Sequence, residues 1–194
     1  MKILIRLVFL PILLVSVGCE VPFSQRNYPE ITFTHLPPIS LDVARIDIIQ
    51  LFEPAIRPPN IEHKMPLAPH IAISRWVSDR LKSTGTSGRA IVTIRDASVT
   101  EERLKAIGGI WSALKIKQSE RYVGRIEVEI EAIGGKGLRA ARAIAKTQRS
   151  RTIIEDSTMR QREILWFEMT ERMMQDFDRT LEAQIRQHLT AFLK

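Results

Sequence analysis

Cysteine is nearly absent from this chain, since Cys19 is the only one among 194 residues. A lone cysteine excludes an internal disulfide, so the fold must be stabilised by packing even in an oxidising compartment. Several catalytic signatures are also missing: a G-x-S-x-G nucleophile elbow, an H-E-x-x-H zinc motif and, after the glycine-rich run 134–137, the Gly-Lys-Ser/Thr ending of a phosphate-binding loop. These absences predict a protein that is not an enzyme and that holds neither a metal nor a cofactor.

A long apolar run is missing as well. One apolar stretch extends from Leu7 to Val17, which is shorter than the about 20 residues that a transmembrane helix needs. Two basic residues precede this stretch, and a Gly-Cys pair follows it. A basic start, an apolar middle and a small residue at the cleavage site are typical of a secretory signal peptide. We therefore predict that residues 1–18 are a signal peptide.

The residues Ser16-Val17-Gly18-Cys19 resemble the lipobox of bacterial lipoproteins. The resemblance implies that the thiol of Cys19 receives a diacylglycerol, that the chain is cut just before it, and that the new amine is acylated. Two or three acyl chains would hold the protein on a membrane. In the enterobacterial members of the family the next residue sorts the protein, and Glu20 favours the outer membrane. A buried or free thiol and an intermolecular disulfide are the alternatives.

Composition limits the partners. Removal of residues 1–18 leaves 194 − 18 = 176 residues, enough for one domain, and lowers the net charge from +7 to +5 because Lys2 and Arg6 are lost. A basic chain suggests an anionic partner. Export excludes nucleic acid and leaves anionic lipid, lipopolysaccharide or an acidic protein. A basic surface that only keeps the protein soluble is the alternative.

The mature chain divides into a tether and a domain. Residues 19–40 lack periodicity and contain four prolines, so we predict an extended tether. A single domain follows over residues 41–194, beginning with an alternating strand at 41–52. Four prolines within 53–66 exclude both helix and central strand, and a loop of this length is often functional or disordered.

The next elements alternate in type. Apolar residues at helical spacing predict a helix from Pro69 to Thr84 that Gly85 ends. A strand is expected at 90–95, with a possible extension to 99, and a short helix at 101–107. Residues 111–120 fit either helix or loop.

The clearest strand extends from Arg125 to Ala132, where apolar and charged residues alternate strictly. A hairpin centred on 134–137 would place Ile130 opposite Ala141, and large residues opposite alanines would leave room for a helix. The wet face would then pair Glu129 with Arg142, although Arg125 would oppose Lys146. The alanine content of 138–147 also permits a helix, and we prefer the strand because 125–132 needs a partner.

The last expected element is a long helix over 158–193, capped by Asp156, Ser157 or Thr158. Its apolar stripe recurs every four residues and is formed by Met169, Met173, Phe177, Leu181, Ile185 and Leu189. The order β-α-β-β-β-α predicts an α+β fold, with a mainly antiparallel four-stranded sheet and two helices packed on one face.

One segment of the sequence is unusually rich in basic residues. Five basic residues lie within thirteen positions that contain no acid: Arg139, Arg142, Lys146, Arg149 and Arg151. Such a row can bind phosphates or carboxylates, or it can guard a sheet edge against pairing. The other candidates have simpler explanations: the histidines (His35, His63, His70 and His188) lack metal-ligand spacing, and Glu127, Glu129 and Glu131 form a solvated face.

Lipobox, tether and element order together resemble small envelope lipoproteins. Two families fit: the lipoprotein that plugs the outer-membrane lipopolysaccharide translocon, and the auxiliary lipoprotein of lipid-transporting ABC systems, which the strand 44–52 and the Arg75-Trp76 helix resemble. The resemblance implies a non-catalytic accessory subunit of a lipid or lipopolysaccharide transport or assembly complex, on the periplasmic side of the outer membrane. It would dock through a sheet edge or the 53–66 loop. The alternative is a structural lipoprotein that binds peptidoglycan or another envelope protein.

Overall fold

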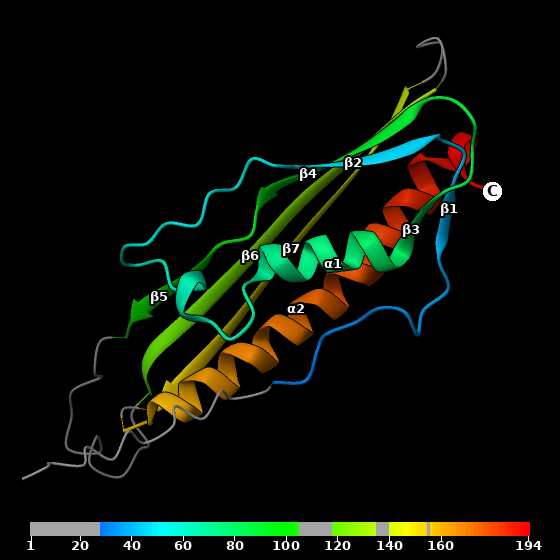
Figure 1. The fold of residues 1–194 in the computed structure, drawn as a ribbon. Coiled ribbons are helices and arrows are strands. Elements are labelled where there is room, and N and C mark those ends of the chain that lie inside the picture. The colour runs from blue at the N-terminus through cyan, green and yellow to red at the C-terminus, as the bar shows by residue number, and fades with distance from the viewer. Residues whose placement is uncertain (1–27, 105–117, 135–139, 155) are drawn as a thin grey trace, which may run out of the picture.

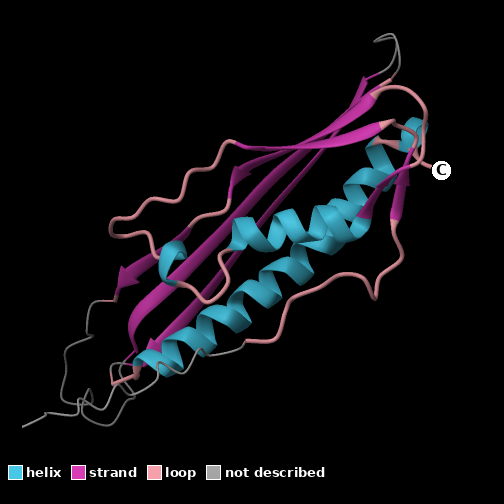
Figure 2. Cartoon of the chain, in the orientation of Figure 1, coloured by secondary structure: helices cyan, strands magenta, loops and turns pink. Residues whose placement is uncertain are grey.

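The computed structural model describes residues 28–104, 118–134, 140–154 and 156–194, and it has two layers. A long twisted sheet forms one layer, and helices α1 (Pro69–Arg80) and α2 (Met159–His188) lie together on one face of it (Figures 1 and 2). The predicted α+β class, with two helices on one face, is confirmed. The signal peptide and Cys19 lie outside the described residues.

The sheet is built around β6 (Gln118–Ile133), its longest strand. One side of β6 pairs with β7 (Ala140–Ile154) over its whole length, and the other side pairs first with β5 (Val99–Arg103) and then with β4 (Arg89–Asp96), all antiparallel. Beyond β4, the strand β2 (Arg45–Gln50) pairs in parallel. The described sheet therefore has five strands rather than the predicted four. It is mixed, because β2 and β4 are parallel while the pairings of β6 with β4, β5 and β7 are antiparallel. Both β4 and β5 pair with the same side of β6, one after the other along it.

The helix predicted at 101–107 was wrong for residues 101–103, which belong to β5. Residues 105–107 lie outside the described chain. Between β4 and β5 the Asp96 carboxylate accepts a hydrogen bond from the Ser98 amide at 2.9 Å, and Val99 is fully buried. Helix-favouring side chains at 101–103 are thus overruled by pairing with β6. Part of the uncertain stretch, residues 118–120, begins β6.

The hairpin of β6 and β7 confirms the strand over the helix for 140–147, but its predicted register was wrong by two residues. Ile130 pairs with Ala143 rather than Ala141. A shift of two keeps every side chain on its predicted face. The observed register also places Lys146 opposite Glu127, which removes the expected repulsion between Lys146 and Arg125.

Small residues let α2 lie close to the sheet. A Cβ on Gly124 would be 2.4 Å from the Met173 sulfur, and Ala143 and Ala145 are almost completely buried. The predicted apolar stripe of α2 is buried along its whole length. The core therefore forms where a broad helix face meets glycine and alanine positions in β6 and β7.

Both helices are shorter than predicted at their C-terminal ends. The helix α1 stops at Arg80 because residues 81–83 form β3 (Leu81–Ser83), which pairs in parallel with β1 (Ile39–Leu41) in a second, two-stranded sheet. The helix α2 stops at His188 and is followed by the 3-10 turn η4 (Thr190–Phe192). Its start confirms Thr158 among the three predicted caps, since Thr158 and Gln161 form a capping box.

The boundary of the expected tether is corrected. Residues 28–38, which we call the strap, lie along α2 and α1, and β1 follows them directly (Figure 1). Phe33 in the strap is 5% exposed, and its amide donates a hydrogen bond of 2.9 Å to Asp79. The strap is therefore part of the folded domain, and residues 19–27 of the expected tether lie outside the described chain.

Candidate functional site

Three strands of the described sheet, β2, β5 and β7, have no strand partner on their outer side. The outer side of β5 is covered by the loop 53–66, because the Ile61 amide donates to the Val99 carbonyl and the Glu101 amide donates to the Pro59 carbonyl. The side chains of the other two, β2 and β7, differ in kind. The β2 edge, which we define as Ile48, Ile49, Leu51 and Ile56, exposes apolar side chains. Their exposed fractions are 43%, 43%, 59% and 82%. An edge strand with unpaired backbone groups and apolar side chains is a template for pairing with another strand.

The strand β7, in contrast, carries most of the basic row. Arg142 and Lys146 lie on the helix-free face beside glutamates: Lys146 is 3.0 Å from Glu127, and Arg142 is 3.3 Å from Glu129. The predicted proximity of Arg142 and Glu129 is therefore confirmed, although in the strand register Arg142 lies directly opposite Glu131.

The basic row does not form one surface among its described members. Arg149 points to the helix side of the sheet and contacts Asp176 of α2 at 2.6 Å. Burial opposes ionisation of Asp176, but hydrogen bonds and the charges of Arg149 and Arg179 hold its pKa below the usual range. Arg151 is exposed and has no polar partner among the described residues, and Arg139 lies outside them. Anion binding by the row stays a prediction, and Arg151 is its one described member without a carboxylate partner.

The three glutamates of β6 are not a uniformly solvated face. Glu129 is only 6% exposed, and its carboxylate accepts hydrogen bonds from Arg95 at 2.9 and 3.1 Å in addition to the contact with Arg142. Two arginines from neighbouring strands thus neutralise one buried carboxylate. The open face of the sheet is a ladder of paired charges rather than an acid–base pair.

A buried arginine joins the two helices and the strap, and the sequence analysis missed it. Arg80 is 1% exposed and donates to Asp178 at 3.0 Å, to Glu182 and to the Pro37 carbonyl oxygen. Asp178 also accepts a hydrogen bond of 2.7 Å from the Trp76 indole. The two carboxylates lie about 100 positions from Arg80 in the sequence and Pro37 lies 43 positions from it, so no local pattern signals the cluster. The cluster is structural, because it closes the seam between α1 and α2.

The proline-rich segment 53–66 is an irregular loop, as predicted, and a buried carboxylate holds it in place. Glu62 is 0% exposed and accepts hydrogen bonds from the amides of Ala55 at 3.1 Å and Val99 at 3.2 Å, and from the Asn60 side chain at 3.2 Å. Glu62 therefore ties the loop to the start of β5 and fixes the backbone next to the exposed Ile56. Both carboxylate oxygens of Glu62 already accept hydrogen bonds, so Glu62 is not free to bind a metal.

The histidines show no metal centre in the part of the chain that the structure describes, where no group of three or more potential ligands occurs. Burial lowers the pKa of His70, and the charge of Glu62 partly opposes this shift. The His70 ring lies 6.2 Å from that of Phe52, so it packs beside the loop. His63 is exposed, and His188 is the last residue of α2.

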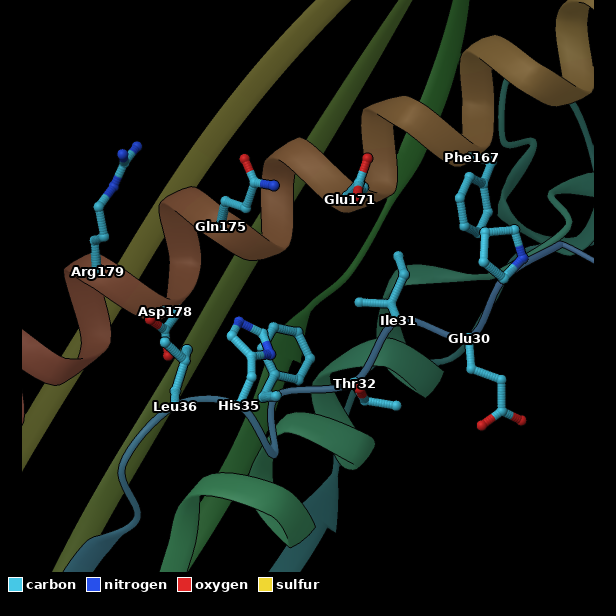
Figure 3. A pocket seen from close by; sticks show the side chains of 12 residues that line it. Glu30, Ile31, Thr32, His35, Leu36, Phe167, Glu171, Gln175, Asp178 and Arg179 are labelled. Atoms are coloured by element: carbon cyan, nitrogen blue, oxygen red, sulfur yellow. The ribbon is translucent and has the colours of Figure 1, made fainter.

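A pocket of about 400 Å³ lies between the strap and α2. Figure 3 shows Phe167, Glu171 and Gln175 of α2 on one side of it and Ile31 and His35 of the strap on the other. Its lining mixes apolar, acidic and basic side chains without a nucleophile–base pair. The pocket therefore marks where the strap crosses α2 and does not point to a reaction.

Comparisons with known proteins add little to this geometry. No protein-family model matches the chain, and no curated protein matches it. Among solved structures, the chain is similar to the rare lipoprotein B from Shewanella oneidensis, with 11% identity and a TM-score of 0.36, over 74% of this chain and 95% of that one. This TM-score is too low to support a common function. Among the described helices, none combines the length and apolarity that crossing a membrane requires.

Proposed function

We propose that this protein is a non-catalytic lipoprotein of the bacterial cell envelope, anchored through Cys19 and acting as an accessory subunit of a lipid or lipopolysaccharide transport or assembly complex. The lipobox-like residues 16–19 support the anchor. The observation that carries the docking role is the β2 edge, which leaves four apolar side chains exposed next to unpaired backbone.

The proposed docking mode is strand addition. A partner strand that pairs with β2 would satisfy the outward backbone groups of Arg45–Gln50 and cover Ile48 on one face and Ile49 on the other, because neighbouring residues of a strand point to opposite faces. The loop 53–66, fixed by Glu62, would add Ile56 to the contact. The occupant is therefore an extended segment of another envelope protein.

The basic residues of β7 support this choice of edge. Charged side chains on an outer strand discourage pairing, whereas apolar ones invite it. Arg142 and Lys146 occupy β7, and the isoleucines occupy β2. The sheet thus protects one edge and offers the other.

The test is copurification from detergent-solubilised envelopes with a cross-linking residue at position 51. Native protein should cross-link to a barrel or ABC-transport component. Ile49→Lys should weaken the association about five- to thirtyfold, because a buried interface residue of this size is worth about 1–2 kcal/mol. The matched control is Ile144→Lys, since Ile144 is 37% exposed on the outer strand β7.

Equal copurification of both variants would contradict docking at β2. Retention on isolated peptidoglycan, without any transport component, would instead favour the structural lipoprotein as the function.

A further inference from the structure

The strap leaves the domain at one defined place. Tyr28, its first described residue, stacks on Phe167 at a ring distance of 5.1 Å and donates a hydrogen bond of 3.2 Å to Glu163. Both partners lie in the first three turns of α2 (Figure 1). The chain that leads back to Cys19 therefore starts near the N-terminal end of α2.

The number of residues between Cys19 and Tyr28 limits how the domain can face a membrane. Nine residue steps separate Cys19 from Tyr28, and an extended chain spans at most about 30 Å over that number. From Glu163 to His188 the helix α2 advances about 38 Å at 1.5 Å per residue. The peptide between Cys19 and Tyr28 is therefore too short for the C-terminal end of α2 to face the bilayer that holds the lipid of Cys19.

The end of the molecule near Tyr28 has a distinct surface, which we call the anchor end and define as Arg151, Ile154, Met159, Arg160 and Ile164. Its three apolar side chains are 45%, 51% and 40% exposed. Its two arginines are exposed and have no polar side-chain partner in the described parts of the chain. The sequence 149–162 contains four arginines against two acids, and the N-terminus of α2 adds about half a positive charge.

We propose that the anchor end rests on the surface of an anionic membrane, with Arg151 and Arg160 contacting lipid phosphates and Ile154, Met159 and Ile164 entering the interface. This inference rests on the proposed lipid anchor and adds an orientation to it. Basic side chains next to exposed apolar ones are the combination that binds such surfaces. The anchor brings the domain to the membrane, and the anchor end sets which part touches it.

The neighbouring surfaces fit an anionic membrane less well. The strap side of α2 exposes acids: Glu30 has a side chain that is 77% exposed, and Glu168 and Glu171 are exposed too. On the helix-free face of the sheet Arg142 and Lys146 are paired with glutamates. The anchor end combines exposed apolar side chains with two unpaired arginines within reach of Cys19.

The contact is tested with a chain that begins at residue 20 and so has no lipid. Such a chain retains the whole described core, which extends from Phe33 to Phe192. It should sediment with vesicles of phosphatidylcholine and phosphatidylglycerol and not with phosphatidylcholine alone. The double variant Arg151→Ala/Arg160→Ala should bind about thirtyfold more weakly, because each arginine near an anionic surface contributes about a factor of five.

The matched control removes two positive charges elsewhere. Lys82→Ala/Arg89→Ala alters exposed residues of β3 and β4 away from the anchor end and should bind as the unaltered chain does. Thermal unfolding of both double variants checks that the fold is intact. No sedimentation of the unaltered chain with the anionic vesicles, or an equal loss in the control, would overturn the orientation.

The two proposals fail separately. Full-length protein recovered from cells without a lipid would contradict the anchor, whatever the vesicles show. A lipidated protein whose lipid-free form ignores anionic vesicles would contradict only the contact through the anchor end.

Discussion

Two regions of this protein use arginine in opposite ways. At the seam between α1 and α2, Arg80 is 1% exposed and is surrounded by Asp178, Glu182 and a carbonyl oxygen. At the anchor end, Arg151 and Arg160 are exposed and have no polar side-chain partner among the described residues. The first arrangement stabilises the fold, whereas the second leaves charge available to a ligand.

This difference in burial and pairing indicates which arginines are available to bind an anionic ligand. A buried arginine that already has its carboxylates cannot bind another anion without losing them. Burial opposes ionisation of Glu182, yet hydrogen bonding from Arg186 and the charge of Arg80 hold its pKa below the usual range. Counting arginines along the sequence does not separate these two groups, because their partners come from distant elements.

The largest expected effect is at the seam. Asp178→Ala should destabilise the protein by about 3–5 kcal/mol, because it removes one of the two carboxylates that neutralise the buried Arg80 and leaves the Trp76 indole unpaired. Chemical denaturation measures this loss. Glu168→Ala, an exposed residue of the same helix, should change the stability by less than about 0.5 kcal/mol. If Asp178→Ala lost no more stability than Glu168→Ala, the stabilising role of the Arg80 cluster would be contradicted.

Glu62 is a second buried charge, and it differs from Asp178 because neutral donors hold it instead of an arginine. Glu62→Ala should cost about 1–3 kcal/mol, since the amides of Ala55 and Val99 lose their acceptor. The same change should increase hydrogen exchange at both amides. Unchanged exchange there would show that the carboxylate does not hold the loop.

Close in sequence to the anchor end, Arg162 has polar partners, unlike Arg151 and Arg160, and one of these partners gives the stability a pH dependence. The Tyr122 hydroxyl contacts Glu120 at 2.8 Å and Arg162 at 2.7 Å, and burial, together with the charge of Glu101, raises the pKa of Tyr122 to about 12. A raised pKa contributes stability that is complete below pH 10, the ordinary tyrosine value, and is lost as the pH rises toward 12.

Stability of the native protein should therefore fall between pH 10 and 12 more than that of Tyr122→Phe, as followed by denaturation at each pH. Parallel curves for the two proteins would contradict the assignment to Tyr122.

The smallest effect on stability is expected for the unpaired arginines. Arg151→Ala and Arg160→Ala should each change the free energy of unfolding by less than about 0.5 kcal/mol, because neither side chain has a partner to lose. Thermal unfolding measures this directly. A loss of several kcal/mol from either one would mean that the anchor end is structural and would erase its contrast with the seam.

The parts of the fold that sequence patterns predicted are those set by local periodicity. The alternation of 125–132 predicted β6, the four-residue repeat from Met169 to Leu189 predicted the buried face of α2, and Thr158 was among the predicted caps. The errors arise where distant partners decide. Leu81–Ser83 form a strand because β1, about 40 positions earlier, offers a parallel partner.

The candidate site was predictable to a smaller extent for the same reason. The wet face shared by Arg142 and the glutamates followed from strand alternation, but the burial of Glu129 depends on Arg95 in another strand. The strap could not be expected from a segment rich in proline and poor in periodicity, because its packing depends on α1 and α2. The contrast between Arg149 and Arg151 likewise depends on where Asp176 lies in α2.

The most direct test of the whole account is the intact mass of the protein recovered from the membrane fraction of the cells that make it. The account predicts a chain that begins at Cys19 and carries a diacylglyceryl group and an amide-linked acyl chain, and it predicts that Cys19→Ser abolishes both the modification and membrane retention. An unmodified, uncleaved chain in the cytosol, or full membrane retention of Cys19→Ser, would contradict it.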